Sequence, residues 1–366
     1  MIGTATIDQT YLMKSLVALL EMPSPTGYHR PIIAWLEGTI AALGISGLQM
    51  VKTRKGALCV TLPGTSPQGT RALSGHIDTL GAMVRAIKPN GRLMLTQLGG
   101  YAWNAVESEN VTVYAVSNGR TVRGTIQTVS PSVHTGPDVY DGKRNDERME
   151  VRLDARTSCT ADTRALGIDV GDFVFFDPRV ECTDTGYIKS RHLDDKAGVA
   201  VMLAVLQALA ACGGAPAVRT SFYFSNYEEV GHGAATGLPA DLQDLLVIDM
   251  AASTTGEHQN SDEYSVGICA KDSSGPYDLE LRRELVALAQ QHQIPYRIDT
   301  YPRYGSDGSA LLRAGGDVRV GLIGPGLDAS HAYERTHVDS LMATARLALA
   351  YVQSTWQGTD VKDGLP

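Results

Sequence analysis

Hydrophobic residues recur with a helical period near the start of the chain and again beyond residue 189. Apolar positions three and four apart predict helices over 11–20 and 31–43, with a turn rich in proline and glycine between them. Later in the chain, strand-like runs at 218–225, 245–249 and 318–323 alternate with helical patterns at 197–211, 279–293 and 340–353. This alternation predicts an α/β fold in which a mixed central sheet is flanked by helices.

The segment from residue 82 to residue 178 has a different pattern. Short runs of β-type residues, such as 111–116 and 124–129, are separated by turns containing Gly, Pro and Asn, and no long helical pattern appears. We therefore expect a β-barrel-like domain at 82–178 inserted into a catalytic α/β domain made of 1–81 and 179–366. A polar stretch at 135–150 predicts a mobile loop within the insertion.

Charge and hydropathy narrow the class of partner. The formal net charge of -8 provides no basic field for a phosphate backbone or an anionic lipid surface, so we expect no nucleic-acid partner. No apolar run reaches the ~20 residues of a membrane helix, and the first 21 residues lack the features of a signal peptide. A small molecule or a peptide is the expected partner.

The cysteines indicate the compartment and the type of metal ligand. They are odd in number, widely scattered and never spaced as a Cys-x-x-Cys pair: Cys59, Cys159, Cys182, Cys212 and Cys269. This usage predicts reduced thiols in the cytoplasm and no thiolate zinc site. Histidines and carboxylates remain as candidate metal ligands.

Polar clusters follow several of the strand-like runs, where open α/β sheets place their ligand crevice. His76 and Asp78 are two residues apart, so they project to the same side of an extended segment, where one can bind a metal while the other orients it. Asp194 and Asp195 begin a helix; their alternative role is N-capping. For His76 and Asp78, the alternative is that the histidine has only a structural role.

Three further positions complete the candidate cluster. Glu228 and Glu229 end an apolar strand, where two acids are unfavourable unless something positive compensates them. Asp249 ends another such strand, with a helix or turn cap as its alternative role, and His331 lies in a polar loop after a third. Such a nitrogen and oxygen donor set suits a pair of zinc, cobalt or manganese ions. Two metals about 3.5–4 Å apart share a carboxylate and a bridging water, and a non-ligating glutamate moves the proton.

These motifs give the chain a family resemblance over nearly its whole length. They are the segments 24–28, 76–78, 166–172, 194–198, 228–231 and 305–310, together with Asp249 and His331. With them the chain resembles the tetrahedral, glutamyl and deblocking aminopeptidases, which belong to the co-catalytic dinuclear-metal exopeptidases. The resemblance implies the metal-exopeptidase fold, with the β insertion mediating subunit contacts.

The resemblance also implies roles for single residues. Asp194 bridges the two metals, and the remaining ligands are His76 and Asp249 at one site and Glu229 and His331 at the other. His337 is the alternative to His331 as the last metal ligand.

Four more residues receive roles in the same way. Glu228 acts as the general acid/base, and the Asp78 carboxylate hydrogen-bonds the distal nitrogen of the first histidine ligand. Ser306 and Asp307 are the implied substrate-binding residues.

The function implied is a metal-dependent aminopeptidase that removes the N-terminal residue of short peptides, with two divalent ions per subunit and a homo-oligomer ranging from a dimer to a tetrahedral dodecamer. The alternatives are a related carboxypeptidase or N-acyl-amino-acid deacylase. In deacylase relatives, however, an α/β lid follows the glutamate pair, whereas here a β-rich insertion precedes Asp194. A metal-free glycosidase leaves the histidines unexplained, and a non-catalytic scaffold leaves the retained Glu228 unexplained.

Overall fold

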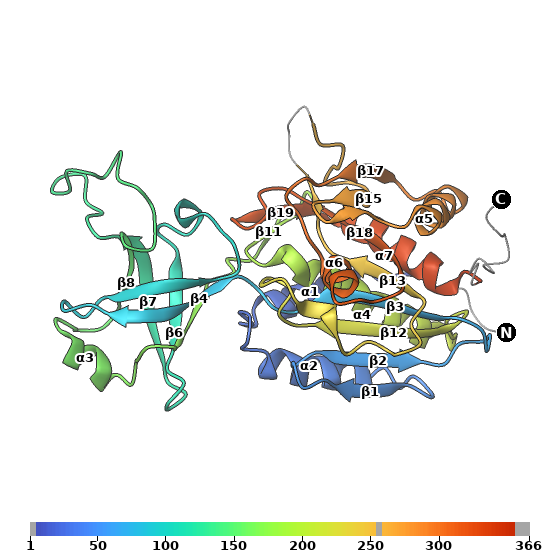
Figure 1. Cartoon of the computed structure of the whole chain (residues 1–366), viewed down its shortest axis with the longest axis horizontal. Coiled ribbons are helices and arrows are strands. Elements are labelled where there is room, and N and C mark those ends of the chain that lie inside the picture. The colour runs from blue at the N-terminus through green and yellow to red at the C-terminus, as the bar shows by residue number, and fades with distance from the viewer. Residues whose placement is uncertain (1–4, 254–257, 356–366) are drawn as a thin grey trace.

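The computed structural model describes residues 5–253 and 258–355. Figure 1 shows a large α/β body and, to one side of it, a smaller β body reached through a narrow connection. The α/β class, the mixed central sheet and the closed barrel predicted from the sequence are confirmed. The domain limits at 82 and 178 remain a prediction.

The main sheet has ten strands. They are β1 (Gln49–Lys52), β2 (Leu58–Leu62), β3 (Thr70–His76), β12 (Arg219–Ser225), β13 (Asp244–Ile248), β14 (Ala251–Ala252), β15 (Val266–Asp272), β16 (Gly275–Pro276), β17 (Tyr296–Thr300) and β18 (Arg319–Leu327). Their order is β1-β2-β12-β3-β13-β18-β15-β16, with β14 beside β18 and β17 beside β15. The central strands β12, β3, β13 and β18 are parallel, so their carboxyl ends meet at one edge.

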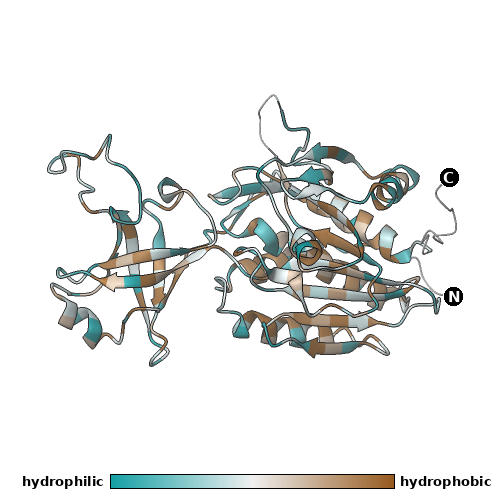
Figure 2. Cartoon of the chain, in the orientation of Figure 1, coloured by the Kyte–Doolittle hydropathy of each residue, from teal (hydrophilic) through white to brown (hydrophobic). Residues whose placement is uncertain are grey.

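Helices cover both faces of this sheet. They are α1 (Gln9–Leu20), α2 (Arg30–Ala41), α4 (Leu193–Cys212), α5 (Leu279–Gln291), α6 (Asp307–Arg313) and α7 (Val338–Gln353). Leu246 and Ile248 of β13 join the large core with five of the helices, while Leu245 and Val247 join a smaller core with α6. Successive strand residues point to opposite faces, so an uninterrupted apolar run is needed where both faces are covered. Figure 2 shows these central strands as mostly hydrophobic.

Helix α4 runs through the middle of the large body. It has 20 residues, and an 18-residue stretch of it has a mean hydropathy of 1.5, so the helix is long and apolar enough to cross a membrane. In the fold, however, 78% of that stretch is buried. The sequence prediction concerned an unbroken apolar run of ~20 residues, and the charged residues Asp194, Asp195 and Lys196 occupy the first turn of this helix. An all-round apolar helix is typical of a protein core.

The smaller body is a closed barrel with the order β4-β5-β8-β7-β6-β9. Its strands are β4 (Gly81–Ile87), β5 (Leu93–Leu98), β6 (Asn110–Tyr114), β7 (Thr121–Thr128), β8 (Met149–Leu153) and β9 (Phe173–Phe176), with a short helix η1 (Trp103–Ala105) and α3 (Thr160–Ala165). Gly124, Ile126 and Thr128 are buried and alternate with more exposed residues, as expected when one strand face points into a barrel. Closure leaves no unpaired strand edge in the barrel.

A three-stranded sheet lies where the barrel rejoins the large body. Its strands are β10 (Glu181–Cys182), β11 (Tyr187–Ser190) and β19 (Glu334–His337), in that order. β19 pairs antiparallel with β11, which brings the chain just before α4 next to the chain just after His331.

The loop predicted to be mobile connects β7 to β8. Two of its basic residues form ion pairs within the chain, with Arg144 bound to Glu107 at 2.8 Å and Arg148 bound to Asp138 at 3.1 Å. Its last two residues already belong to β8. The mobility itself stays a prediction.

Candidate metal centre

The carboxyl ends of three parallel strands supply most of the site. His76 is the last residue of β3 and is paired in register with Ser225, the last residue of β12. Glu228 follows β12 by three residues, and Asp249 directly follows β13. Because parallel strands end at the same edge, these side chains converge on one crevice.

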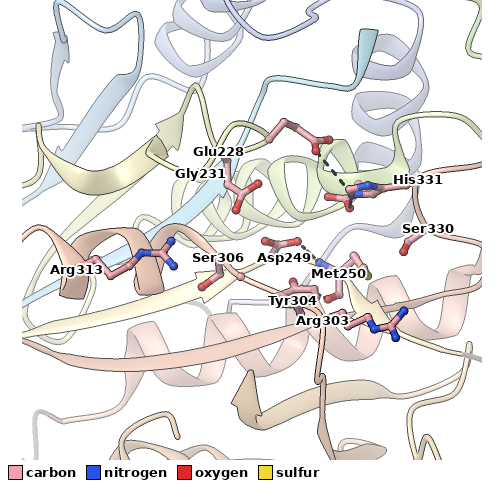
Figure 3. A pocket seen from close by; sticks show the side chains of 13 residues that line it. Glu228, Gly231, Asp249, Met250, Arg303, Tyr304, Ser306, Arg313, Ser330 and His331 are labelled. Carbon is pink, nitrogen blue, oxygen red and sulfur yellow. Dashed lines mark hydrogen bonds and ion pairs between the residues drawn. The ribbon is translucent and has the colours of Figure 1, made fainter. Parts of the chain in front are cut away.

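Two donor groups form there, and they share one residue. The ligand atoms of His76, Asp194 and Asp249 lie within 4.8 Å of one another, as do those of Asp194, Glu229 and His331. Asp194 reaches both groups, since one oxygen is 3.0 Å from Nε2 of His76 and the other is 3.4 Å from Nε2 of His331. Figure 3 shows Asp249, Glu228 and His331 around the same space.

The two rival histidines occupy different places. His331 lies in the donor group described above, in the loop between β18 and β19. His337 instead caps α7: its Nδ1 accepts the backbone N–H of Asp339 at 3.1 Å, and its Nε2 bonds the carbonyl oxygen of Thr185 at 2.9 Å. The structure therefore places only the first of the two in a donor group.

The electrostatics of the crevice fit bound cations. Oε1 of Glu229 is buried and has no hydrogen-bond partner within the described part of the chain. Burial raises the pKa of Glu229 well above its ordinary value, and the neighbouring carboxylate of Asp194 adds to the effect. Burial and the same carboxylate raise the pKa of Asp249 to about 7. So many buried acids are unfavourable as anions without compensating positive charge, and divalent ions coordinated by oxygen and imidazole nitrogen provide it.

Asp78 differs from the prediction in one respect. Nδ1 of His76 bonds the backbone carbonyl oxygen of Asp78 at 2.8 Å, while the nearer carboxylate oxygen is 3.8 Å away, beyond hydrogen-bond distance. The carboxylate accepts the N–H groups of Glu228 and Glu229 at 3.1 and 3.3 Å, and the hydroxyl of Thr26 at 2.7 Å. Three donors already occupy it, so Asp78 orients the histidine through its main chain and the glutamate pair through its side chain.

Two buried acids hold the main chain of the site. Asp195 accepts the N–H of Gly198 at 3.1 Å, as a capping residue should, and also the N–H of His76 at 3.2 Å. A Cβ at Gly198 would collide with this carboxylate, so the helix needs glycine there. Glu334, which received no role from the sequence, accepts the N–H groups of Asp194 and His331. No local sequence signal identifies those two donors, because one lies 140 residues away.

The donor groups open into a pocket of about 410 Å³. Ser306 lines it, close to Tyr304 in Figure 3. Asp307 is only 1% exposed and binds the N–H of Ala234 and the hydroxyl of Ser74, so its carboxylate holds the loop after β12. Its predicted contact with substrate remains untested.

Comparison with known proteins identifies a matching family and related proteins. The model of the family described as M42 glutamyl aminopeptidase matches residues 56–347. The chain is 46% identical over 342 residues to "Putative aminopeptidase YhfE" of Bacillus subtilis, which covers 93% of this chain and 97% of that protein.

Solved structures share the fold. An aminopeptidase from the archaeon Desulfurococcus kamchatkensis has a TM-score of 0.85 at 21% identity, covering 94% of this chain and 95% of the other. The TET1 peptidase of Pyrococcus horikoshii, which can assemble into a tetrahedron or a large octahedral shell, has a TM-score of 0.79 at 20% identity and covers 93% and 99%.

Proposed function

Because the chain belongs to the M42 glutamyl aminopeptidase family, we propose that it removes the N-terminal residue of short peptides with the help of two divalent metal ions. The observation that carries the proposal is the position of Asp194 between two donor groups. This carboxylate directs one oxygen toward the histidine of each donor group, which suits a ligand shared by two metal ions. His76 and Asp249 complete one proposed site, and Glu229 and His331 the other.

Glu228 is the proposed proton carrier. It lines the pocket but belongs to neither donor group, and its carboxylate lies 3.7 Å from Nε2 of His76. Burial raises its pKa well above the ordinary value, and the carboxylates of Asp249 and Asp307 add to the effect although His76 opposes it. Metal ions held by these residues would supply Lewis-acid polarisation of the scissile carbonyl and would acidify the attacking water. In this proposal Glu228 would take a proton from the attacking water and return it to the leaving amine.

The pocket supports a small substrate with a free terminus. Its volume is near the lower end of the roughly 300–1,000 Å³ typical of small-ligand sites. The acids around the two donor groups offer acceptors for a protonated N-terminal amine. Ser306 borders the same space and is the proposed contact for the substrate backbone.

The alternative activities fit less well. All six barrel strands precede Asp194, which is the insertion order that favours an aminopeptidase over the deacylase relatives. A glycosidase needs two carboxylates, but it gives no role to a histidine in each donor group.

We also propose a homo-oligomer, supported by the TET1 neighbour that forms closed shells. A cytoplasmic location stays a prediction; the five cysteines are free thiols, which is compatible with a reducing compartment.

The test combines metal analysis with a panel of substrates. We expect two equivalents of metal per chain and cleavage of aminoacyl-anilides and short peptides with a free N-terminus. Peptides that carry an N-acetyl group should resist cleavage. Release of C-terminal residues, or of the acyl group from N-acyl amino acids, would replace the proposed activity by the carboxypeptidase or the deacylase.

A further inference from the structure

We propose that the barrel is a positioning element for one of the two metal sites, the one containing Glu229 and His331. This inference rests on the proposed dinuclear site. The barrel reaches the site through two sets of contacts, one made by backbone at Gly99 and Gly100 and the other by an ion pair between Glu109 and Arg191.

The first contact fixes the imidazole ring. Nδ1–H of His331 donates to the carbonyl oxygen of Gly100, which lies between β5 and η1 of the barrel. With its proton on Nδ1, the ring presents the Nε2 lone pair to Asp194 and Glu229, at 3.4 and 3.7 Å. A hydrogen bond of this kind sets the tautomer and the direction of a ligating histidine.

The residue before it touches the other ligand. Gly99 has a φ of +78°, and a Cβ added there would lie 2.5 Å from Leu80 and 3.3 Å from a carboxylate oxygen of Glu229. The barrel backbone therefore lies close enough to Glu229 that a side chain at position 99 would crowd its carboxylate. The segment is braced from the barrel side, because the buried Tyr101 donates its hydroxyl to the carbonyl of Gly81 at 3.1 Å.

The second contact reaches the loop that carries His331 through a buried arginine. Arg191 is 1% exposed, and its guanidinium donates to Glu109 at 3.1 Å and to the carbonyl of Ala105, both of which follow β5 within the barrel. It also donates to the carbonyl of Ala332 at 3.2 Å, the residue next to His331. One buried cation thus ties the barrel to the ligand loop.

The other metal site has no such dependence among the described residues. Nδ1 of His76 bonds the carbonyl of Asp78, and Asp249 donates nothing to and accepts nothing from the barrel; it binds the N–H of Met250. Both partners belong to the large body. A displaced barrel should therefore disturb one histidine ligand and leave the other in place.

Two matched pairs of variants test the idea. Glu109→Gln removes the ion pairs to Arg191 and Arg179, and its control is Glu150→Gln. Glu150 is likewise a buried barrel glutamate with two basic partners, Lys88 and Arg92, but both lie within the barrel.

Gly99→Ala pushes the barrel backbone away from Glu229 and Leu80. Its control is Gly119→Ala, also a barrel glycine with a left-handed backbone, with a φ of +70° and only Tyr114 within reach of a Cβ. If Glu109→Gln does not fold, this glycine pair decides the question.

The first readout is hydrogen–deuterium exchange of the metal-free proteins, followed by mass spectrometry of peptides covering 328–337. We expect faster exchange in Glu109→Gln and Gly99→Ala and wild-type exchange in both controls. The second is titration with Co²⁺, where we expect about 10- to 100-fold weaker binding of one ion and unchanged binding of the other.

Unchanged exchange, equal changes in the controls, or equal weakening of both ions would overturn the positioning role. A wild-type protein that binds fewer than two ions would instead contradict the proposed function. In that case the exchange measurement still decides whether the barrel holds the His331 loop.

Discussion

One carboxylate oxygen of Glu334 accepts the backbone N–H of His331 at 3.0 Å, at a point where the backbone of His331 has a left-handed φ of 64°. The other oxygen accepts the N–H of Asp194 at 3.1 Å. A single buried acid therefore holds the main chain of two proposed ligands that are far apart in the sequence.

Replacing Glu334 by glutamine should weaken the site. The amide keeps one acceptor oxygen but turns an NH₂ group toward the second backbone N–H, which leaves a buried donor unsatisfied. We expect a loss of about 1–3 kcal/mol in the free energy of unfolding, measured by denaturant titration of the metal-free protein. Metal affinity is measured as well, and its control is Glu263→Gln. That variant breaks the ion pair to Arg335, which lies on the same strand as Glu334. Wild-type stability and metal affinity in Glu334→Gln would contradict this role.

Glu228 and Glu229 are neighbours, yet their variants should fail differently. Glu228→Gln should retain both metals and lose about 10²–10⁴ in kcat, because only the proton carrier is removed. Glu229→Gln should also lose metal from one site, since its carboxylate lies in a donor group. Metal content by mass spectrometry and kcat measured on the same samples separate the two roles. A metal loss seen only in Glu228→Gln would reverse the assignment.

Prolonged chelation should abolish peptide hydrolysis, and zinc, cobalt or manganese should restore it. Bound metal should also stabilise the fold, by about 2.7 kcal/mol for each site when the free ion is at 100 times the Kd of that site. Calorimetry with and without metal measures the corresponding rise in Tm. Full activity in protein shown to be metal-free would contradict the dinuclear mechanism.

Arg303 and Arg313 line the pocket and form no ion pair among residues 5–253 and 258–355. In Figure 3 they stand on either side of Ser306 and Tyr304. We expect glutamine at either arginine to raise KM for peptides with an acidic first or second residue about 2- to 5-fold, the effect of an exposed ion pair. KM for neutral peptides should hardly change. Arg283→Gln on α5 is the control, and equal effects on acidic and neutral peptides would rule out the contact.

The loop between β7 and β8 carries two exposed apolar side chains, Tyr140 at 81% and Val133 at 54% exposure. If it forms part of a subunit contact, these are the groups that assembly would bury. Light scattering should then give a multiple of the subunit mass, and Tyr140→Asp should shift it toward smaller species. Leu279→Asp, at an exposed apolar position of the large body, serves as the control. A strictly monomeric, fully active wild-type enzyme would remove the assembly proposal.

The sequence by itself determined the elements and the chemical type of the site. Long apolar runs with a helical or a strand period have few alternatives once both faces of a sheet are covered, so the observed helices and central strands lie close to the predicted ranges. Acids and histidines directly after such runs must gather at the carboxyl edge of a parallel sheet. This is why His76, Glu229 and Asp249, which lie in two adjoining donor groups, could be expected at one edge of the sheet.

The tertiary structure decided how the site is held. The carboxylate of Asp78 serves the amides of Glu228 and Glu229 while its carbonyl serves His76, and a barrel carbonyl at Gly100 orients His331. Backbone carbonyls and N–H groups are the same in every residue, so a sequence carries no mark of which of them a side chain will meet. Partners more than 200 residues apart, such as Gly100 and His331, are brought together only by the packing of the barrel against the large body.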